Sequence, residues 1–464
     1  MNKSSIKHDK FIIVGDIVSP ISLKELQCFD GYIQVEYGKI TKIGTRETFT
    51  ENKNAGHYKD IAVGHLSQGQ FLLPGFVDCH THAPQFPNLG LGLDRPLLEW
   101  LDKYTFPLEN KYADRQFAAN VYEKVVKRLL NNGTTTACYF GSLHLEGTLE
   151  LVKSVVTHKQ RALVGKVSMN VENNAGYFNK TENELRDVET FVKNVYAYKN
   201  NLVEPIITPR FALSCDSELM EGLSQIAKKY QCATQSHISE NKEEIEFVLK
   251  TNPVCSNYTE VYDRCEILNK RCIMAHAVYL SECEMSIFAR KGVSVAHCPA
   301  SNTRLKSGLC PVRTLLDHNV CVGLGTDVSG GDSASILDAM RRAMDVSEHL
   351  LMTGGSGPAL DWKEALYLAT VGGAKALGLQ DKIGAFGVGK SFDALVVDVG
   401  DPRGPIDNYT DSLLGTEALV DLAQKFVYCG DDRNIVQVYV NGEQVKHTLP
   451  PYASVATFPF FLCE

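Results

Sequence analysis

The stretch FLLPGFVDCHTHAPQ, Phe71–Gln85, decides the fold, because it begins as an apolar run and ends in two histidines separated by one residue. Side chains two positions apart in a strand lie on the same face. His80 and His82 are therefore predicted to point the same way, with Asp78 one step deeper on that face. A pair of buried imidazoles is either a hydrogen-bonded part of the core or part of a site, and the rest of the chain separates these interpretations.

Short apolar runs recur along the middle of the chain, with helical patterns between them; after the last run, Ile336, Leu337, Met340 and Met344 follow helix spacing. Eight strand–helix units with fully apolar strands are typical of a (β/α)8 barrel, which we predict as the α/β core of the fold. The predicted strands begin at Phe71, Thr134, Ala162, Glu204, Cys232, Cys272, Val293 and Val320. The longest connection, LGLGLDRPLLEWLDKYTFPLE with its flanks, joins the first two strands and is predicted to cover the barrel mouth.

The two ends of the chain differ from the middle, because they read as hairpins. GYIQVEYGKITKIGT near the start alternates and turns, and DALVVDVG and IVQVYVNGEQV lie near the end, the latter with an Asn-Gly turn. We predict that both ends pack together as one small composite β-sandwich domain, with the barrel inserted between them. The predicted boundaries are 1–73 and 385–464 for the composite domain and 74–384 for the barrel.

Composition restricts the class of protein. The 464 residues are 44% hydrophobic and 22% charged, as in an ordinary soluble globular protein. A net charge of -8 gives no support to a nucleic-acid partner. The sequence contains no run of 18 apolar residues, so no membrane span is predicted. The opening MNKSSIKHDK lacks the apolar core of a signal peptide, and the 14 scattered cysteines form no C-x-x-C pair. These features predict free thiols and a cytoplasmic location.

Further ionisable residues stand where later strands end. His237, His276 and Asp327 close strands five, six and eight, and His297 closes strand seven. Active sites of such barrels lie at the carboxyl ends of the strands, so these residues converge with His80 and His82 on one mouth. A single histidine there would be interpreted as a core residue, but the convergence of several favours a metal site. Neutral imidazoles with a carboxylate suit zinc, and iron(II) is the main alternative.

Two neighbouring residues refine this hypothesis. Strand four ends in ITPRF, and Arg210 cannot bridge two cations, so we expect one metal per chain. Glu240 lies three residues after His237, where the chain has left the strand, and can curl back toward a metal-bound water.

At these residues the chain resembles the amidohydrolase superfamily and, within it, the family of guanine deaminases. The resemblance covers nearly the full length. It is carried by PGFVDCHTHAPQ, PLLEWLDKYTFP, TPRFALSC, QSHISEN, MAHAVYL, GLGTDVSGG and IGAFGVGKSFDA, which together are far more specific than any one of them.

The resemblance implies a hydrolytic deamination of guanine to xanthine and ammonia by a zinc-dependent homodimer. It implies that His80, His82, His237 and Asp327 hold the zinc, and that His276 is either a further ligand or a hydrogen-bond partner of the metal-bound water. Glu240 matches the proton shuttle, with Asp327 taking the water proton. The positions that match purine contacts are Gln85, Arg210 and Phe211, beside His237, Glu240 and Asp327.

The sequence also offers five alternative interpretations, two for the whole protein and three for single segments or residues. A sibling enzyme acting on an oxidised purine, pterin or triazine differs only in pocket residues, and a non-catalytic scaffold is disfavoured because every expected ligand is present. Gly384–Ser391 satisfies the P-loop pattern G-x-x-x-x-G-K-S, but a strand rather than a helix is predicted after it. Trp100 is expected to pack a capping helix rather than line the pocket. For His297, a place in a barrel layer and a role in the site stay equally open.

Overall fold

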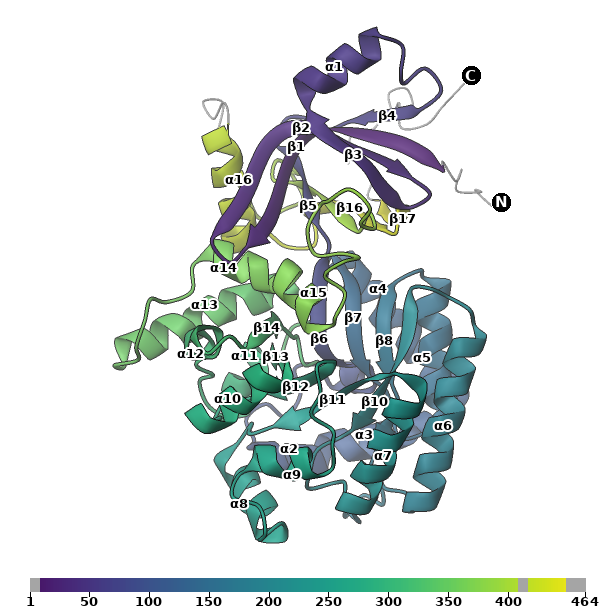
Figure 1. The fold of residues 1–464 in the computed structure, drawn as a ribbon, viewed down its shortest axis with the longest axis vertical. Coiled ribbons are helices and arrows are strands. Elements are labelled where there is room, and N and C mark those ends of the chain that lie inside the picture. Colours follow the sequence, from purple (N-terminus) through teal and green to yellow (C-terminus); the bar gives the residue numbers. More distant parts are fainter. Residues whose placement is uncertain (1–8, 408–415, 448–464) are drawn as a thin grey trace.

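The computed structural model describes residues 9–407 and 416–447. Its larger unit is a barrel of parallel strands surrounded by helices, with a second sheet beside one end (Figure 1). The barrel strands, in their spatial order, are β6 (Phe76–His82), β7 (Thr134–Phe140), β8 (Arg161–Gly165), β10 (Val203–Pro209), β11 (Ala233–Ile238), β12 (Cys272–His276), β13 (Ser294–His297) and β14 (Cys321–Leu324), with β9 (Val167–Ser168) added on β10. The predicted (β/α)8 barrel is confirmed.

The barrel is closed by backbone hydrogen bonds between its first strand and the segment after its last. The amide of His82 donates to the carbonyl of Val328 over 3.1 Å, and the amide of Asp327 donates to the carbonyl of His80 over 2.9 Å. The closure therefore brings Asp327 to the same end of the barrel as His80 and His82, although it lies far from them in sequence.

The outer helices bury one face each against the strands. In α4 (Arg115–Asn131), Asp114 caps the first turn by accepting from the amides of Gln116 and Phe117, and Val125 and Leu129 are buried one turn apart. The other principal helices of the barrel are α5 (Leu145–Thr157), α6 (Thr181–Ala197), α7 (Ser217–Tyr230), α8 (Lys242–Thr251), α9 (Tyr258–Arg264), α10 (Glu282–Lys291), α11 (Pro299–Arg304), α12 (Val312–Asp317) and α13 (Ile336–Met352). Among the described residues, none of the helices combines the length and apolar character needed to cross a bilayer.

The apolar run at Phe71 was predicted as one strand, and that prediction is wrong. The run is divided at Gly75 into β5 (Gln70–Pro74), which belongs to the second sheet, and β6, which opens the barrel. A side chain at Gly75 would lie 2.2 Å from the hydroxyl of Thr135, so only glycine allows the chain to pass this closely from one sheet to the other.

Both ends of the described chain meet in the second sheet. β5 pairs parallel with β1 (Lys10–Ser22) and antiparallel with β15 (Ala394–Asp398), so N-terminal and C-terminal strands are neighbours. The sheet has the order β17–β16–β15–β5–β1–β2–β3, with β4 paired to β1. Its remaining strands are β2 (Glu25–Glu36), β3 (Lys39–Thr45), β4 (Ala62–His65), β16 (Ile435–Val440) and β17 (Glu443–His447), flanked by α1 (Arg46–Asn54) and α16 (Thr416–Cys429). The domain boundaries themselves stay a prediction, and 1–8, 408–415 and 448–464 lie outside the described residues.

The segment with the P-loop pattern and the connection between the first two barrel strands both have simple structures. The P-loop-like Gly384–Ser391 leads from α15 (Gly373–Ala376) toward strand β15, and the Lys390 amine donates to the carbonyls of Gln380 and Ile383. The long first connection folds into short helical turns. These are η1 (Ala83–Asn88), α2 (Leu97–Trp100), η2 (Leu101–Thr105), α3 (Phe106–Glu109) and η3 (Asn110–Ala113). Near the other end of the chain, the helices that precede β15 are α14 (Trp362–Tyr367), η4 (Leu368–Gly372) and α15.

Candidate active site

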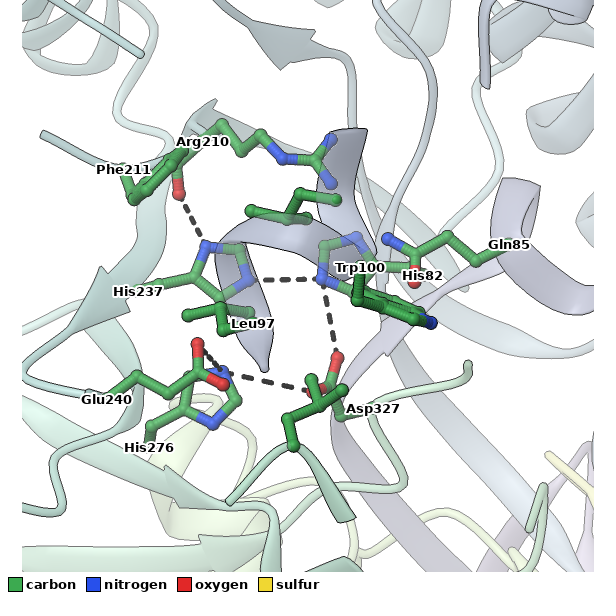
Figure 2. Close-up of a pocket in the computed structure, with 12 residues that line it drawn as sticks. His82, Gln85, Leu97, Trp100, Arg210, Phe211, His237, Glu240, His276 and Asp327 are labelled. Atoms are coloured by element: carbon green, nitrogen blue, oxygen red, sulfur yellow. Dashed lines mark hydrogen bonds and ion pairs between the residues drawn. The ribbon is translucent and has the colours of Figure 1, made fainter. Parts of the chain in front are cut away.

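A cavity lies at the carboxyl ends of the barrel strands (Figure 2). Its polar wall consists of predicted site residues: His82, Gln85, Arg210, His237, Glu240, His276 and Asp327. Its apolar wall includes Leu97 and Trp100 from the long connection, together with Phe211 and Leu305. The structure thus brings residues from five barrel strands and one covering segment around a single space.

The ring nitrogens and the carboxylate converge closely. Nε2 of His82 lies 3.1 Å from Nε2 of His237 and 3.4 Å from Oδ1 of Asp327, and Nε2 of His80 lies 3.2 Å from the same oxygen. Ligands about 2.1 Å from a tetrahedral metal are separated from one another by about 3.4 Å. The spacing of these donor atoms therefore fits one metal ion, and two overlapping triads, His80–His82–His237 and His80–His276–Asp327, could hold it.

The protonation of the imidazoles supports this fit. Nδ1 of His237 lies 2.5 Å from the carbonyl oxygen of Arg210, which can only accept, so the proton sits on Nδ1 and the lone pair of Nε2 faces the site. Burial, together with the neighbouring His80, holds the pKa values of His82 and His237 well below their usual range. Neutral imidazoles with inward lone pairs are what a metal ion requires.

Glu240 and His276 form the next side of the cavity. Nε2 of His276 lies 3.3 Å from Oε2 of Glu240 and 3.9 Å from Oδ2 of Asp327, and its Nδ1 pairs with the amide oxygen of Asn302 over 2.8 Å. Burial and the charge of Asp327 raise the pKa of Glu240 to about 8. This glutamate therefore lies beside the converging nitrogens, and His276 lies between it and Asp327.

The strand ends hold these groups in uncommon backbone conformations. His276 has φ 74° and Asp327 has φ 45°, both in the left-handed region that costs non-glycine residues energy. Burial opposes ionisation of Asp327, but the hydrogen bond and charge of His80 still hold its pKa well below the usual range. A locally strained backbone thus aims an ionised carboxylate at the imidazoles.

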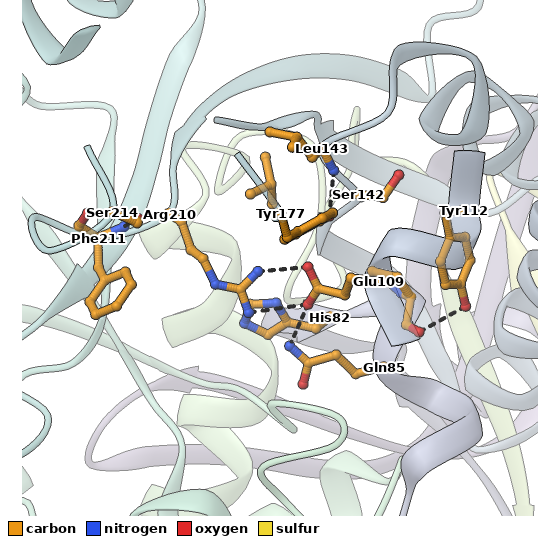
Figure 3. Close-up of polar contacts among 12 residues, drawn as sticks. His82, Gln85, Glu109, Tyr112, Ser142, Leu143, Tyr177, Arg210, Phe211 and Ser214 are labelled. Atoms are coloured by element: carbon orange, nitrogen blue, oxygen red, sulfur yellow. Dashed lines mark hydrogen bonds and ion pairs between the residues drawn. The ribbon is translucent and has the colours of Figure 1, made fainter. Parts of the chain in front are cut away.

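The opposite wall contains an arginine that is already paired. Both terminal nitrogens of Arg210 donate to the carboxylate of Glu109, over 2.7 and 3.1 Å, and the amide of Gln85 donates to the same carboxylate over 3.0 Å (Figure 3). The ring of Phe211 stands edge-on to His237 with centroids 6.5 Å apart. Sequence reasoning missed Glu109, because its partner Arg210 lies 101 residues away and no local pattern links them.

Three other residues differ in their relation to the site. Asp78 accepts from the amide and hydroxyl of Thr326 over 3.1 and 2.5 Å, and so braces the first and last strands beneath the site. Among the described residues, no partner is found for either ring nitrogen of the buried His297, which is not part of the cavity wall. Trp100 was expected to pack a capping helix; it is buried in the covering segment, where its indole donates to the carbonyl of Leu91, and it also lines the cavity.

This combination of a parallel barrel with a histidine–aspartate cluster at its mouth has clear relatives. The model of the amidohydrolase family matches residues 71–445, most of the chain. The chain therefore belongs to the amidohydrolase family, as its sequence motifs predicted.

More specific relatives carry one name. Guanine deaminase of Rattus norvegicus is 48% identical over 391 residues, covering 84% of this chain and 86% of the relative, and guanine deaminase of Escherichia coli strain K12 is 34% identical over 90% and 91%. A solved structure of guanine deaminase from C. acetobutylicum with bound guanine in the active site superimposes with a TM-score of 0.84 at 34% identity, covering 94% of this chain and 99% of that one. Within the amidohydrolases, the chain is thus a member of the guanine deaminase family.

Proposed function

We propose that the protein catalyses the hydrolytic deamination of guanine to xanthine and ammonia with one zinc ion per chain. The observation that carries this proposal is the cavity in which a histidine–aspartate cluster and a buried glutamate face Arg210 and Gln85. Family membership at 34–48% identity supports the substrate. It also disfavours the alternative of an oxidised purine, pterin or triazine as substrate.

The proposed metal ligands are His80, His82, His237 and Asp327, supported by the separations of 3.1–3.4 Å among their donor atoms. His276 is either a further ligand or a hydrogen-bond partner of the attacking water. Zinc suits neutral imidazoles with one carboxylate, and iron(II) is the alternative. When bound, such a metal lowers the pKa of a coordinated water far below its ordinary value, to about 7 in well-studied enzymes.

The proposed proton transfers use two carboxylates. Replacing the amine on C2 of guanine requires a water proton to be removed, the ring nitrogen beside C2 to be protonated, and the amine to leave as ammonia. Asp327 accepts the proton from the attacking water. Glu240, 3.3 Å from His276, donates a proton to the ring nitrogen, takes the second water proton from the hydroxyl group formed on C2 and delivers it to the departing amine. The first water proton then passes from Asp327 back to Glu240, which restores both carboxyl groups. One water enters and one ammonia leaves, so the atoms balance.

The proposed guanine contacts come from Arg210, Gln85 and Phe211, with the catalytic residues His237, Glu240 and Asp327 on the other side. Guanine presents O6 and N7 as adjacent acceptors, which match the N–H groups of a guanidinium. Gln85 retains one N–H and one lone pair beyond its bonds to Glu109 and to the Ser329 amide, and both suit the nitrogen edge of the ring. Phe211 offers a packing face for the flat base.

The test is a substrate panel. Purified protein is incubated with guanine, adenine, 8-oxoguanine, a pterin and a triazine, and ammonia release is measured together with the purine product. The proposal expects xanthine and ammonia in equal amounts from guanine, with the other compounds far slower. Ammonia release from another heterocycle in preference to guanine would replace the substrate and leave the proposed chemistry standing.

We also propose a homodimer in a reducing compartment such as the cytoplasm. The dimer is supported by family resemblance, and the compartment by the free thiols of all cysteines in the described residues. Light scattering of the purified protein tests the dimer, and imaging of the tagged full chain in cells tests the location.

A further inference from the structure

Glu109 is the buried centre of the wall opposite the histidine–aspartate cluster. Its side chain is fully buried at the end of α3, and its two oxygens take three hydrogen bonds. Two come from Arg210 and one from Gln85, the two side chains proposed to read the purine edge (Figure 3). Because the carboxylate of Glu109 contacts both Arg210 and Gln85, it can set the position of each side chain.

The contacts of Glu109 fix orientation as well as position. A carboxylate only accepts, so the amide of Gln85 must turn its NH2 toward Glu109; its oxygen then accepts from the amide of Ser329 over 3.1 Å. Arg210 is held on a second side by the ring of Phe106, whose centroid lies 5.1 Å from the guanidinium carbon. Neither the guanidinium of Arg210 nor the side-chain amide of Gln85 can rotate without breaking a buried contact.

The charge of Glu109 is as important as its shape. Arg210 is buried and lines the same cavity as the imidazoles of the cluster, where a second cation is expected to bind. A buried guanidinium without a carboxylate partner is strongly unfavourable and moves toward water. The carboxylate neutralises this charge and leaves one N–H on each terminal nitrogen for a ligand.

We propose that Glu109 is a positioning residue for substrate recognition: it holds Arg210 and Gln85 in the orientation that reads the oxygen and nitrogen acceptors of the purine. This inference rests on the proposed function. It assigns to the α3 segment of the covering connection a role in specificity, in addition to covering the mouth.

The first experiment is a double-mutant cycle with Glu109→Gln, Arg210→Met and both together, measuring kcat and KM for guanine and the zinc content of each protein. Gln keeps the shape but presents an NH2 to the guanidinium, so Arg210 turns away. We expect Glu109→Gln to raise the KM for guanine about tenfold or more, as for loss of a charged hydrogen bond, with kcat changing less and zinc retained. In the Arg210→Met background, the same change should have a smaller effect, because only the contact of Glu109 with Gln85 remains to be lost. Independent, multiplicative effects would overturn the proposal.

The second experiment uses 2-aminopurine, which has the C2 amine and lacks the oxygen at position six. Glu109→Gln should lower kcat/KM for guanine much more than for 2-aminopurine, because only guanine offers the lost acceptor. An equal loss on both substrates would mean that Glu109 serves stability alone. Glu109→Asp keeps the charge and should recover part of the preference; it also provides the measurement if Glu109→Gln does not fold.

Asp393→Asn is the matched control. Asp393 also pairs with a buried arginine, Arg161, through two hydrogen bonds of 2.9 and 3.1 Å, but at the opposite end of the barrel. It should lower the melting temperature without changing the ratio of guanine to 2-aminopurine turnover. If the wild type instead turns over a different heterocycle, the proposed function fails, and the same cycle run on that heterocycle still decides the role of Glu109.

Discussion

The two ends of the barrel each contain a buried arginine–carboxylate pair, and the pairs serve different purposes. At the base, Arg161 at the start of β8 binds Asp393, which also accepts from the backbone amide of Asn441 in the turn between β16 and β17. At the mouth, Arg210 binds Glu109 and borders the cavity. The Arg161–Asp393 pair ties two sheets together, whereas the Arg210–Glu109 pair leaves hydrogen-bond donors facing an open space. Similar chemistry is therefore structural or functional according to what lies on its free side.

The comparison predicts that turnover depends on the mouth and not on the base, and the largest effect is expected at Glu240. Glu240→Gln keeps the shape of the side chain and removes its capacity to move protons. Because proton transfer typically contributes about 10²–10⁴-fold, kcat should fall by about that amount while zinc stays bound. Steady-state kinetics with elemental analysis checks this, and a variant that keeps more than a tenth of wild-type kcat would assign the proton transfers to another group.

A smaller loss is expected when the mouth pair is broken at Arg210. Arg210→Met should lower kcat/KM for guanine on the order of 10²-fold, because a site built around a polar contact loses heavily without it. The substitution also leaves Glu109 buried without its cation, so the melting temperature should fall. Adding Glu109→Gln should recover stability and leave turnover low. If Arg210→Met turns over guanine at a near wild-type rate, the Arg210–Glu109 pair is structural, like the Arg161–Asp393 pair.

The smallest effect on turnover is expected at the base. Asp393→Asn removes the charge partner of the buried Arg161, and breaking a buried pair of this kind typically costs about 3–5 kcal/mol. Chemical denaturation should register that loss, while kcat and KM for guanine in the folded protein stay unchanged. A change in KM with unaltered stability would erase the distinction between the two ends of the barrel.

Much of this architecture follows from the sequence, for local reasons. Most of the eight barrel strands are short apolar runs and are recognisable by themselves, and the histidines at the strand ends converge because parallel strands share one carboxyl edge. The division of the first run at Gly75 was not predicted, since FLLPGFVD is apolar on both sides of the glycine and only the approach of Thr135 reveals the passage between sheets.

The wall of the cavity is less accessible to sequence reasoning. Arg210 and Gln85 were identified by resemblance, but Glu109 lies in a connection of short helical turns, where its position depends on tertiary packing. Trp100 has the same difficulty, since an apolar side chain that packs a lid and one that lines a pocket have the same local pattern. Pairing partners across 101 residues become visible only when the barrel is assembled.

The most direct test of the account is a zinc titration of metal-depleted protein, with xanthine formation from guanine as the readout. The account predicts no turnover without metal and a linear rise that ends at one zinc per chain, because the two donor triads found in the described residues share His80. Full turnover without metal, or a rise that continues to two zinc ions per chain, would contradict it.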